Sequence, residues 1–210
     1  ASSLLINGQT TGVEEKLQIA EKALKSDDQD SQTRMIIGRI ASARATLALT
    51  RYDTTAMIAE SRRTLEYMPP EYLSTRSNAN WTLGYGYLFQ GDRSSARKFF
   101  TKAVSLSQKS GDVFTEILAT VGLGTVQEAD NLLYQAVETY QQVLQLASKQ
   151  PLQIVNEAHL GLARIFYEWN NLEAAEEHGR LSLQLALQYD KAVDRFIPVS
   201  YTHLRAHETV

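Results

Sequence analysis

The sequence predicts an all-α solenoid in which antiparallel helix pairs stack in a row. The first observation behind this class is the stretch 160–179, where an apolar run with helical spacing breaks at Asn170 and Asn171 and restarts at once with Leu172. Such a pattern is typical of two helices joined by a tight turn. The second observation is that the same pattern recurs three times upstream. Because a lone helix pair cannot bury its apolar side, repeated pairs are expected to bury these sides against one another.

Composition and charge agree with this class and exclude several others. The 210 residues are 43% hydrophobic and 21% charged, and four prolines leave long stretches free for helix. A net charge of −3 gives no basic excess for nucleic acid or an anionic membrane. The absence of cysteine excludes disulfides, thiolate metal sites and cysteine nucleophiles. No apolar run approaches the ~18 residues of a membrane span, and no signal peptide is visible.

Helical periodicity predicts each element in order. Acidic, asparagine-, glycine- or proline-containing breaks separate the helices, because such residues cap helices or drive the chain out of the helical region. The breaks are 26–30, 52–53, 68–70, 91–92, 131 and 170–171. The predicted helices are 9–25, 32–51, 55–67, 72–90, 93–109, 113–130, 133–148, 152–169 and 172–187.

These helices form one predicted domain. We expect residues 1–199 to be a repeat solenoid truncated at both ends, and residues 200–210 to be a non-native tail. The chain begins with an apolar phrase that resembles the end of a helix, so we interpret it as a fragment. The predicted units are a half repeat, four full repeats and the start of another: 1–30, 31–70, 71–110, 111–150, 151–189 and 190–199.

Small or compact residues on the second helix of each pair mark the period. Separations of 39, 40 and 39 residues relate Met57, Ala96, Ala136 and Ala175. Seven residues further on, the aligned set is Thr64, Ala103, Val143 and Ser182. Small side chains let two helix backbones approach closely, and a fixed period of this size indicates a solenoid rather than a closed globule.

The segment 83–103 resembles the tetratricopeptide repeat. The matching residues are Leu83, Gly84, Tyr87, Gly91, Asp92, Ala96, Phe100 and Ala103, with the aromatic residue of the first helix displaced by one place to Trp81. The period exceeds the usual ~34 residues. Such elongated repeats resemble those of the large LuxR-type transcriptional regulators related to the maltose-regulon activator, and the segments 54–70 and 167–176 carry that resemblance.

The resemblance implies a right-handed superhelix and a parent protein larger than this chain. In that family a nucleotide-binding module precedes the repeats and a helix-turn-helix that reads DNA follows them. ATP is therefore implied for the parent, and no cofactor is expected for this chain. The sequence contains neither a GxxxxGK[ST] loop nor a basic helix-turn-helix segment. We expect a cytoplasmic bacterial regulatory arm that binds a protein, peptide or small-molecule effector, without direct contact to nucleic acid or membrane; self-association is expected of the parent.

The resemblance also implies that the first helices line a concave binding face. The candidate residues on this face are Arg39, Ser42, Thr46, Asn78, Trp81, Tyr85, Leu88, Thr125, Glu128, Glu157, Arg164 and Tyr167. Trp81 and Tyr85 stand four residues apart and would form one aromatic surface, although either ring could instead pack between repeats. Arg39 and Arg164 would supply positive charge for an acidic partner or ligand.

No catalytic or metal site is predicted. His203 and His207 stand four residues apart, but Leu204 occupies the place of the glutamate in a zinc-protease motif. Their segment, 200–210, resembles translated adapter sequence and is set aside. His159 and His178 could act as acid or base near pH 7, but we expect His159 to lie beside a partner helix and His178 on a polar face.

Two function classes remain open from the sequence. The first is the regulatory arm of a LuxR-type transcription regulator. The second is a generic tetratricopeptide scaffold that holds partner peptides and has no link to transcription. An enzyme ranks below both, since no catalytic constellation is present.

Overall fold

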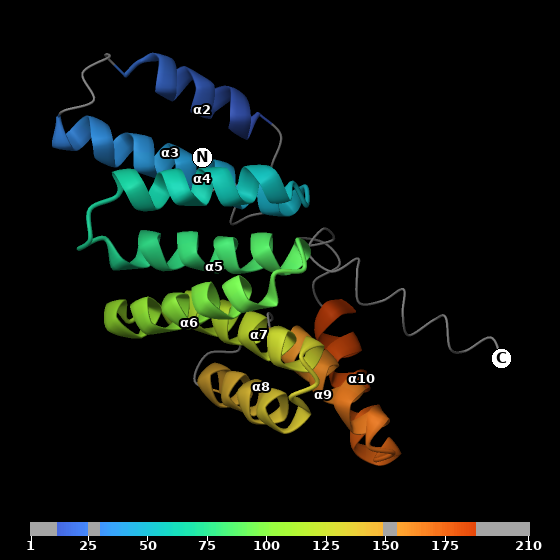
Figure 1. Ribbon diagram of the computed structural model, residues 1–210. Coiled ribbons are helices and arrows are strands. Elements are labelled where there is room, and N and C mark those ends of the chain that lie inside the picture. The colour runs from blue at the N-terminus through green and yellow to red at the C-terminus, as the bar shows by residue number, and fades with distance from the viewer. Residues whose placement is uncertain (1–11, 25–29, 149–154, 188–210) are drawn as a thin grey trace.

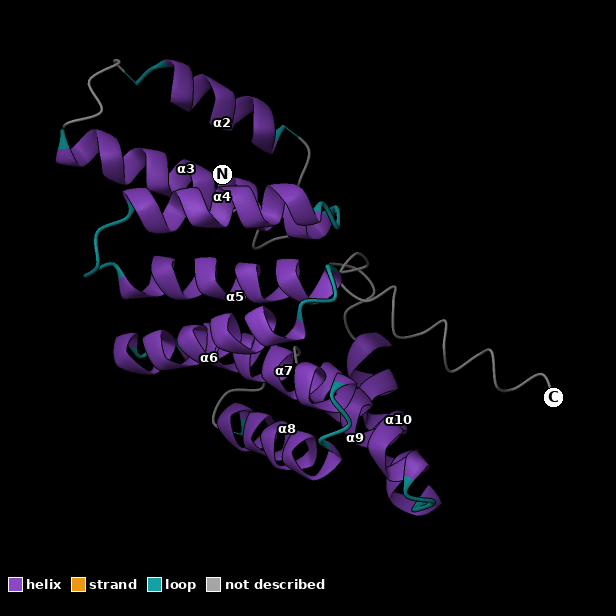
Figure 2. Ribbon diagram, viewed as in Figure 1, coloured by secondary structure: helices purple, strands orange, loops and turns teal. Residues whose placement is uncertain are grey.

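The computed structural model describes residues 12–24, 30–148 and 155–187. These ranges contain nine helices and no strand (Figures 1 and 2). The helices are α2 (Val13–Lys22), α3 (Ser31–Thr50), α4 (Thr54–Tyr67), α5 (Leu73–Phe89), α6 (Arg93–Ser110), α7 (Val113–Ala129), α8 (Leu133–Ala147), α9 (Asn156–Glu168) and α10 (Leu172–Leu187). For α3 to α8 and α10, the predicted bounds differ from these by at most one residue.

The helices stack in chain order, which confirms an all-α solenoid of antiparallel helix pairs (Figure 1). Each helix packs against the next one along the chain. The first helices of the pairs, α3, α5, α7 and α9, also contact one another in sequence, whereas the second helices α4, α6 and α8 make no comparably extensive contact with each other. We call the surface that runs along α3, α5, α7 and α9 the first-helix face.

Aspartate or asparagine caps begin most of the helices that follow a turn. Asp53 accepts a hydrogen bond from the Ala56 backbone N–H at 3.0 Å, and Asp92 accepts one from Ser95 at 3.0 Å. Asp30, Asp112 and Asn171 act in the same way. Each cap satisfies a backbone donor that the first helical turn leaves without a partner. The polar breaks in the sequence therefore fix where the helices start.

The core follows the predicted period of small residues. Met57, Ala96 and Ala136 are fully buried, as are their partners seven residues on, Thr64, Ala103 and Val143. In the last pair Ser182 is buried and Ala175 is partly buried. These positions bring second helices close to the first helices beside them.

Two buried rings fix the stacking of the inner repeats. A β-carbon added at Gly84 would lie 2.5 Å from the Phe100 ring, and one added at Gly122 would also collide with that ring. One repeat further on, Tyr140 fills the space beside two other glycines, Gly124 and Gly161. Each ring therefore lies between the first helix of its own pair and that of the next pair. These glycines therefore allow close helix packing.

Some predictions fall on residues that the structure does not describe. They are residues 1–11 of the half repeat, most of the break at 26–30, the start of the helix at 152–169, the start of a further repeat at 190–199 and the non-native tail at 200–210, with its two histidines. In the described part of the chain, no helix combines the length and the apolar character that crossing a bilayer requires.

Candidate functional site

The twelve predicted binding residues all belong to the first helices of the pairs. They come from α3, α5, α7 and α9. Arg39 and Tyr167 are exposed, Trp81 is buried, and the others are partly buried. The hydroxyls of Thr46 and Thr125 each donate to a carbonyl four residues earlier in their own helix, at 3.1 Å in both cases. Those two side chains therefore already have a partner within the chain.

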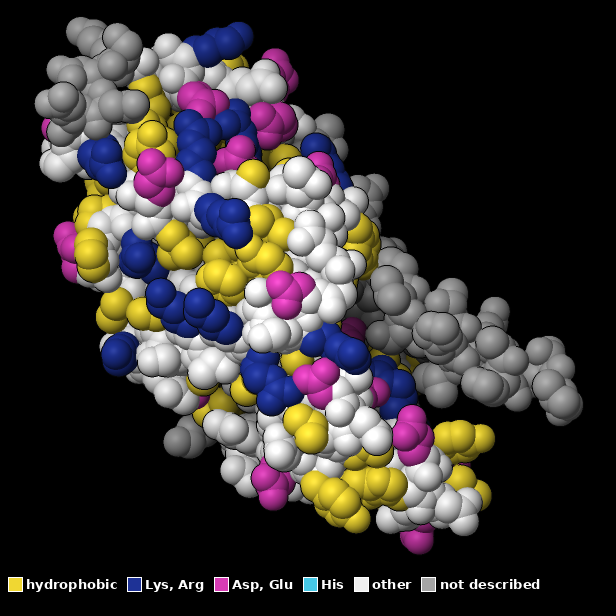
Figure 3. Space-filling model, in the orientation of Figure 1, with side chains coloured by type: hydrophobic (Ala, Val, Ile, Leu, Met, Phe, Trp, Pro, Cys, Tyr) yellow, Lys and Arg dark blue, Asp and Glu magenta, His cyan; other side chains and the backbone are white. Residues whose placement is uncertain are grey.

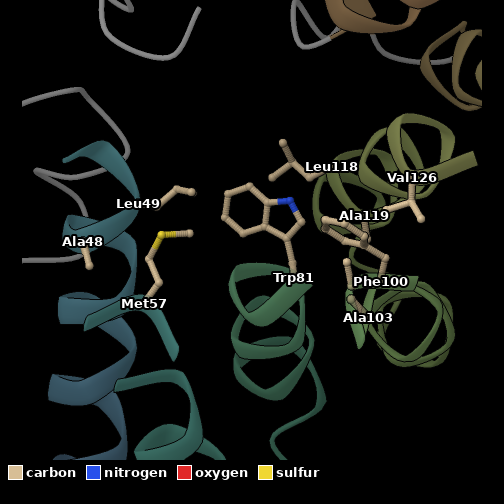
Figure 4. Close-up of a cluster of buried hydrophobic side chains, with 10 residues drawn as sticks. Ala48, Leu49, Met57, Trp81, Phe100, Ala103, Leu118, Ala119 and Val126 are labelled. Carbon is tan, nitrogen blue, oxygen red and sulfur yellow. The ribbon is translucent and has the colours of Figure 1, made fainter. Parts of the chain in front are cut away.

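Trp81 belongs to the core rather than to the exposed surface. Only 6% of this residue is exposed. Its ring lies between Leu49 and Met57 on one side and Leu118 of α7 on the other (Figure 4). Its indole nitrogen is buried and has no hydrogen-bond partner among the described residues. Of the two roles open to Trp81, the structure favours packing between repeats, because α7 covers the ring.

Tyr85 joins this core to the surface. Its ring centroid lies 5.6 Å from that of Trp81 and 5.1 Å from that of Phe100, both in edge-to-face geometry. On its outer side it lies 5.8 Å from Phe89. Burial raises the pKa of the Tyr85 hydroxyl, and the nearby charge of Glu157 raises it further. Tyr85 therefore contacts the buried rings of Trp81 and Phe100 on one side and Phe89, nearer the surface, on the other.

Two residues that the sequence reasoning missed complete that surface. Phe89 is 42% exposed and Tyr52, in the α3–α4 turn, is 40% exposed. Their ring centroids lie 5.6 Å apart. We call Tyr52, Tyr85 and Phe89 the aromatic patch. The i, i+4 series 81, 85, 89 pointed to Phe89, but nothing in the sequence placed Tyr52 beside it.

A polar network ties α7, α8 and α9 together. Arg164 of α9 donates to both carboxylate oxygens of Glu128 on α7, at 2.6 and 2.8 Å. The Tyr140 hydroxyl of α8 donates to the same carboxylate at 3.0 Å. Burial acts to lower the pKa of Arg164, but its hydrogen bonds to Glu128 and the negative charges around it together outweigh that effect and raise the pKa. The charge of Arg164 is therefore matched within the chain, and the expected role toward an acidic partner loses its support.

Glu157 of α9 differs from Glu128. It makes no ion pair and no hydrogen bond through its side chain with another described residue. Burial raises the pKa of its carboxyl, an effect that the charge of Arg164 partly opposes. Burial raises the pKa of the Tyr52 and Tyr85 hydroxyls, and the charge of Glu157 raises it further. The Glu157 carboxylate is therefore partly withdrawn from water.

The two central histidines form a pair. The Nδ1 atoms of His159 and His178 lie 2.8 Å apart, so one ring donates and the other accepts. Phe166 stacks on His178 with its centroid 5.6 Å away. The expectation that His159 lies beside a partner helix is confirmed. The expectation of a polar face for His178 is wrong, because α10 turns this ring toward α9.

The face of the described residues seen in Figure 3 carries apolar side chains and mixed charges. On the side seen in Figure 3, Lys and Arg side chains are interspersed with Asp and Glu. Hydrophobic side chains gather at the lower end of that view, over α8 and the α9–α10 turn. On α8, Tyr134 is 78% exposed, and its ring centroid lies 4.7 Å from that of Trp169.

Together these features define a class of protein, the helical-repeat solenoids of tetratricopeptide type. A family model described as the MalT-like TPR region matches residues 38–207, and the chain belongs to that family. The match begins within α3 and runs beyond α10 into the segment predicted to be a non-native tail. No curated protein sequence matches the chain.

Proposed function

We propose that this chain is the regulatory repeat arm of a bacterial MalT- or LuxR-type transcription regulator, acting in the cytoplasm. Its nucleotide-binding and DNA-binding modules would lie outside this chain, and the arm itself would be non-catalytic. The observation that carries the proposal is the family match over 38–207. The partly exposed aromatic patch on the first-helix face adds a surface that fits a partner or an effector.

The first-helix face is the proposed concave surface. Contacts run between successive first helices but not comparably between successive second helices, as expected when a stack curves toward its first helices. On another first helix, α9, Tyr167 is also exposed. A partner that follows the face would touch α3, α5 and α9 at once.

Regulation would follow from a preference of the partner for one curvature of the arm. Each repeat of a solenoid contacts only its neighbours, so small changes between pairs add up along the stack. A partner that bridges α5 and α9 would bind one curvature more tightly and shift the population toward it. Moving such an equilibrium from 1:99 to 99:1 requires a preference of about 5.5 kcal/mol.

The test uses the full-length gene that encodes this chain. We expect it to encode a phosphate-binding loop before the repeats and a helix-turn-helix after them. Phe89→Ala should then abolish the effector-dependent response of a transcription reporter without lowering the amount of protein. The matched control is Tyr134→Ala, which removes an exposed ring from α8. If the gene lacks both modules, or if Phe89→Ala responds like the wild type, the regulatory proposal is wrong and the generic scaffold remains.

A further inference from the structure

We propose that an ionic cluster holds α2 on the α3–α4 pair and releases this helix as a unit when salt screens the charges, so that the arm opens at this one contact before it unfolds elsewhere. The ionic cluster consists of the side chains that join the three helices through ion pairs: Glu14, Glu21, Arg44, Glu60 and Arg63. This inference goes beyond the proposed function, because it concerns a change of shape in the arm itself and requires no partner.

Two arginines connect the three helices of the ionic cluster. Arg44 of α3 pairs with two carboxylates of α2, that of Glu14 at 3.2 Å and that of Glu21 at 2.7 Å. Arg63 of α4 donates to the other oxygen of the Glu21 carboxylate at 2.8 Å and lies 3.8 Å from Glu60 on its own helix. Burial acts to raise the pKa of Glu21, but hydrogen bonds from Arg63 and Arg44 and their charges together lower it. Glu21 therefore links α2 to both helices of the pair.

The place of Arg44 in the period shows that this contact differs from those of the later repeats. Arg44 stands thirteen residues before Met57, and the same distance before the aligned small residues of the later repeats stand Leu83, Leu123 and Leu162. Leu83 and Leu162 are fully buried. Only 15% of the Arg44 side chain is exposed. Where two later repeats bury a leucine, the first pair therefore has a charged side chain whose ion-pair partners come from α2.

A contact of this kind is sensitive to salt. Partly buried charges lose free energy of hydration that their attraction only partly returns. The side chains of the ionic cluster are 15–35% exposed, so dissolved ions reach them and screen the attraction. The apolar contact beside them, where Val13 and Leu17 pack on α3, does not depend on charge. Salt should therefore weaken the hold on α2 and leave the later repeats, which bury Phe100 and Tyr140, in place.

The length of α2 makes its release measurable. The helix spans ten residues, Val13–Lys22, and begins after Gly12 without a side-chain cap. A helix of fewer than about 12 residues is marginal in water when nothing packs against it. The backbone amides of α2 are therefore protected from exchange with solvent only while the helix lies on α3. Hydrogen exchange reports such a local opening separately from global unfolding.

The test follows hydrogen exchange of the whole chain by NMR at about 0.05 M and about 0.5 M NaCl, a range over which screening becomes strong. We expect the amides of α2 to exchange roughly fivefold faster at the higher salt concentration, and those of α7 to keep their rates. Glu21→Gln removes the link to both arginines. At low salt it should speed the exchange of α2 by up to roughly tenfold, and it should remove most of the salt dependence.

The matched control is Glu15→Gln, which removes an exposed carboxylate of α2 that forms no ion pair with a described residue. Its exchange should stay close to that of the wild type. Arg44→Leu, which introduces the leucine of the later repeats, should also remove most of the salt dependence. Circular dichroism checks that all three variants keep their helices.

Four results would each overturn the inference. They are α2 amides that are unprotected already at low salt, rates in α2 that do not respond to salt, equal rates in Glu21→Gln and Glu15→Gln, and an acceleration in α7 as large as that in α2. None of them bears on the reporter result with Phe89→Ala, so the inference can fail while the proposed function stands.

Discussion

Phe100 and Tyr140 differ from Tyr52 and Phe89 in what their rings contact. The first two are at most 1% exposed and fill spaces that glycines of two adjacent first helices leave open. Tyr52 and Phe89 are 40% and 42% exposed and contact each other at the surface. The comparison teaches that the interior rings hold the stack together, while the surface rings contribute little to stability and remain accessible to a partner.

The last helix pair, α9 and α10, lacks the interior ring that the inner pairs have. Four residues after its aligned small residue stands Gly179, where the inner repeats have Phe100 and Tyr140. The glycine of their first helices is replaced by Ala163. The contact between α9 and α10 instead includes the histidine pair, on which Phe166 stacks. The stacking device of the inner repeats is therefore absent from the last described pair.

The largest expected effect is the loss of an interior ring. Phe100→Ala should lower the free energy of unfolding by about 3–5 kcal/mol, because it leaves a cavity between three helices. Phe89→Ala should lower it by about 1 kcal/mol, since a large part of that ring is already in water. Urea unfolding followed by circular dichroism measures both. Similar losses in the two variants would contradict the division between interior and surface rings.

A smaller effect is expected from filling the space beside an interior ring. Gly122→Ala should destabilise the chain by about 1–3 kcal/mol, because its new methyl group collides with Phe100. Gly179→Ala is the matched control in a helix interior. Its methyl group would lie 4.0 Å from Ala163, so this variant should gain about 0.5–1 kcal/mol from better helix propensity. Opposite signs in the two unfolding free energies are the outcome that we expect.

A substitution in the turn at Tyr52 should have a smaller effect and should raise the free energy of unfolding. Tyr52→Asn should stabilise the chain, because asparagine accepts a positive φ at a lower cost, by about 1 kcal/mol. Loss of the contact with Phe89 takes back part of this gain, which leaves about 0.5 kcal/mol. The thermal midpoint should therefore rise slightly. A clear fall would mean that the Tyr52 ring serves stability, as the interior rings do.

The smallest expected effect concerns pH and the last pair. Burial lowers the pKa of both His159 and His178 below the ordinary value of 6.5, although the charge of Glu177 opposes this. The unfolded chain then binds protons more readily, so the stability that the neutral pair contributes is present above pH 6.5 and is lost as pH falls through the lowered values. Between about pH 7 and 5, urea midpoints of the wild type should fall more than those of the double variant His159→Gln/His178→Gln. Equal slopes would contradict the buried pair.

The helix bounds could be predicted from the sequence because they depend on local signals. Caps such as Asp53 and Asp92 and the small residues of the period act within one or two turns of their own position. Contacts between repeats were harder to foresee. The burial of Trp81 depends on how α7 lies over α5, and the approach of Tyr52 to Phe89 depends on the angle between two pairs.

One long-range contact had a usable signal. Glu128 and Arg164 are separated by 36 residues, which is one period less about one helical turn. Residues at that separation face each other across adjacent first helices. The sequence reasoning placed both on the first-helix face and did not pair them, so it assigned Arg164 to an acidic ligand. Subtracting one helical turn from the period would have revealed the pair.

The reporter response of the full-length regulator carrying Tyr52→Asn tests the central claim most directly. This single substitution removes an exposed ring of the aromatic patch while it makes the turn more favourable. The account predicts that the effector-dependent response is lost even though the protein is at least as stable as the wild type. A full response from the stable variant would contradict the claim that the surface rings serve binding.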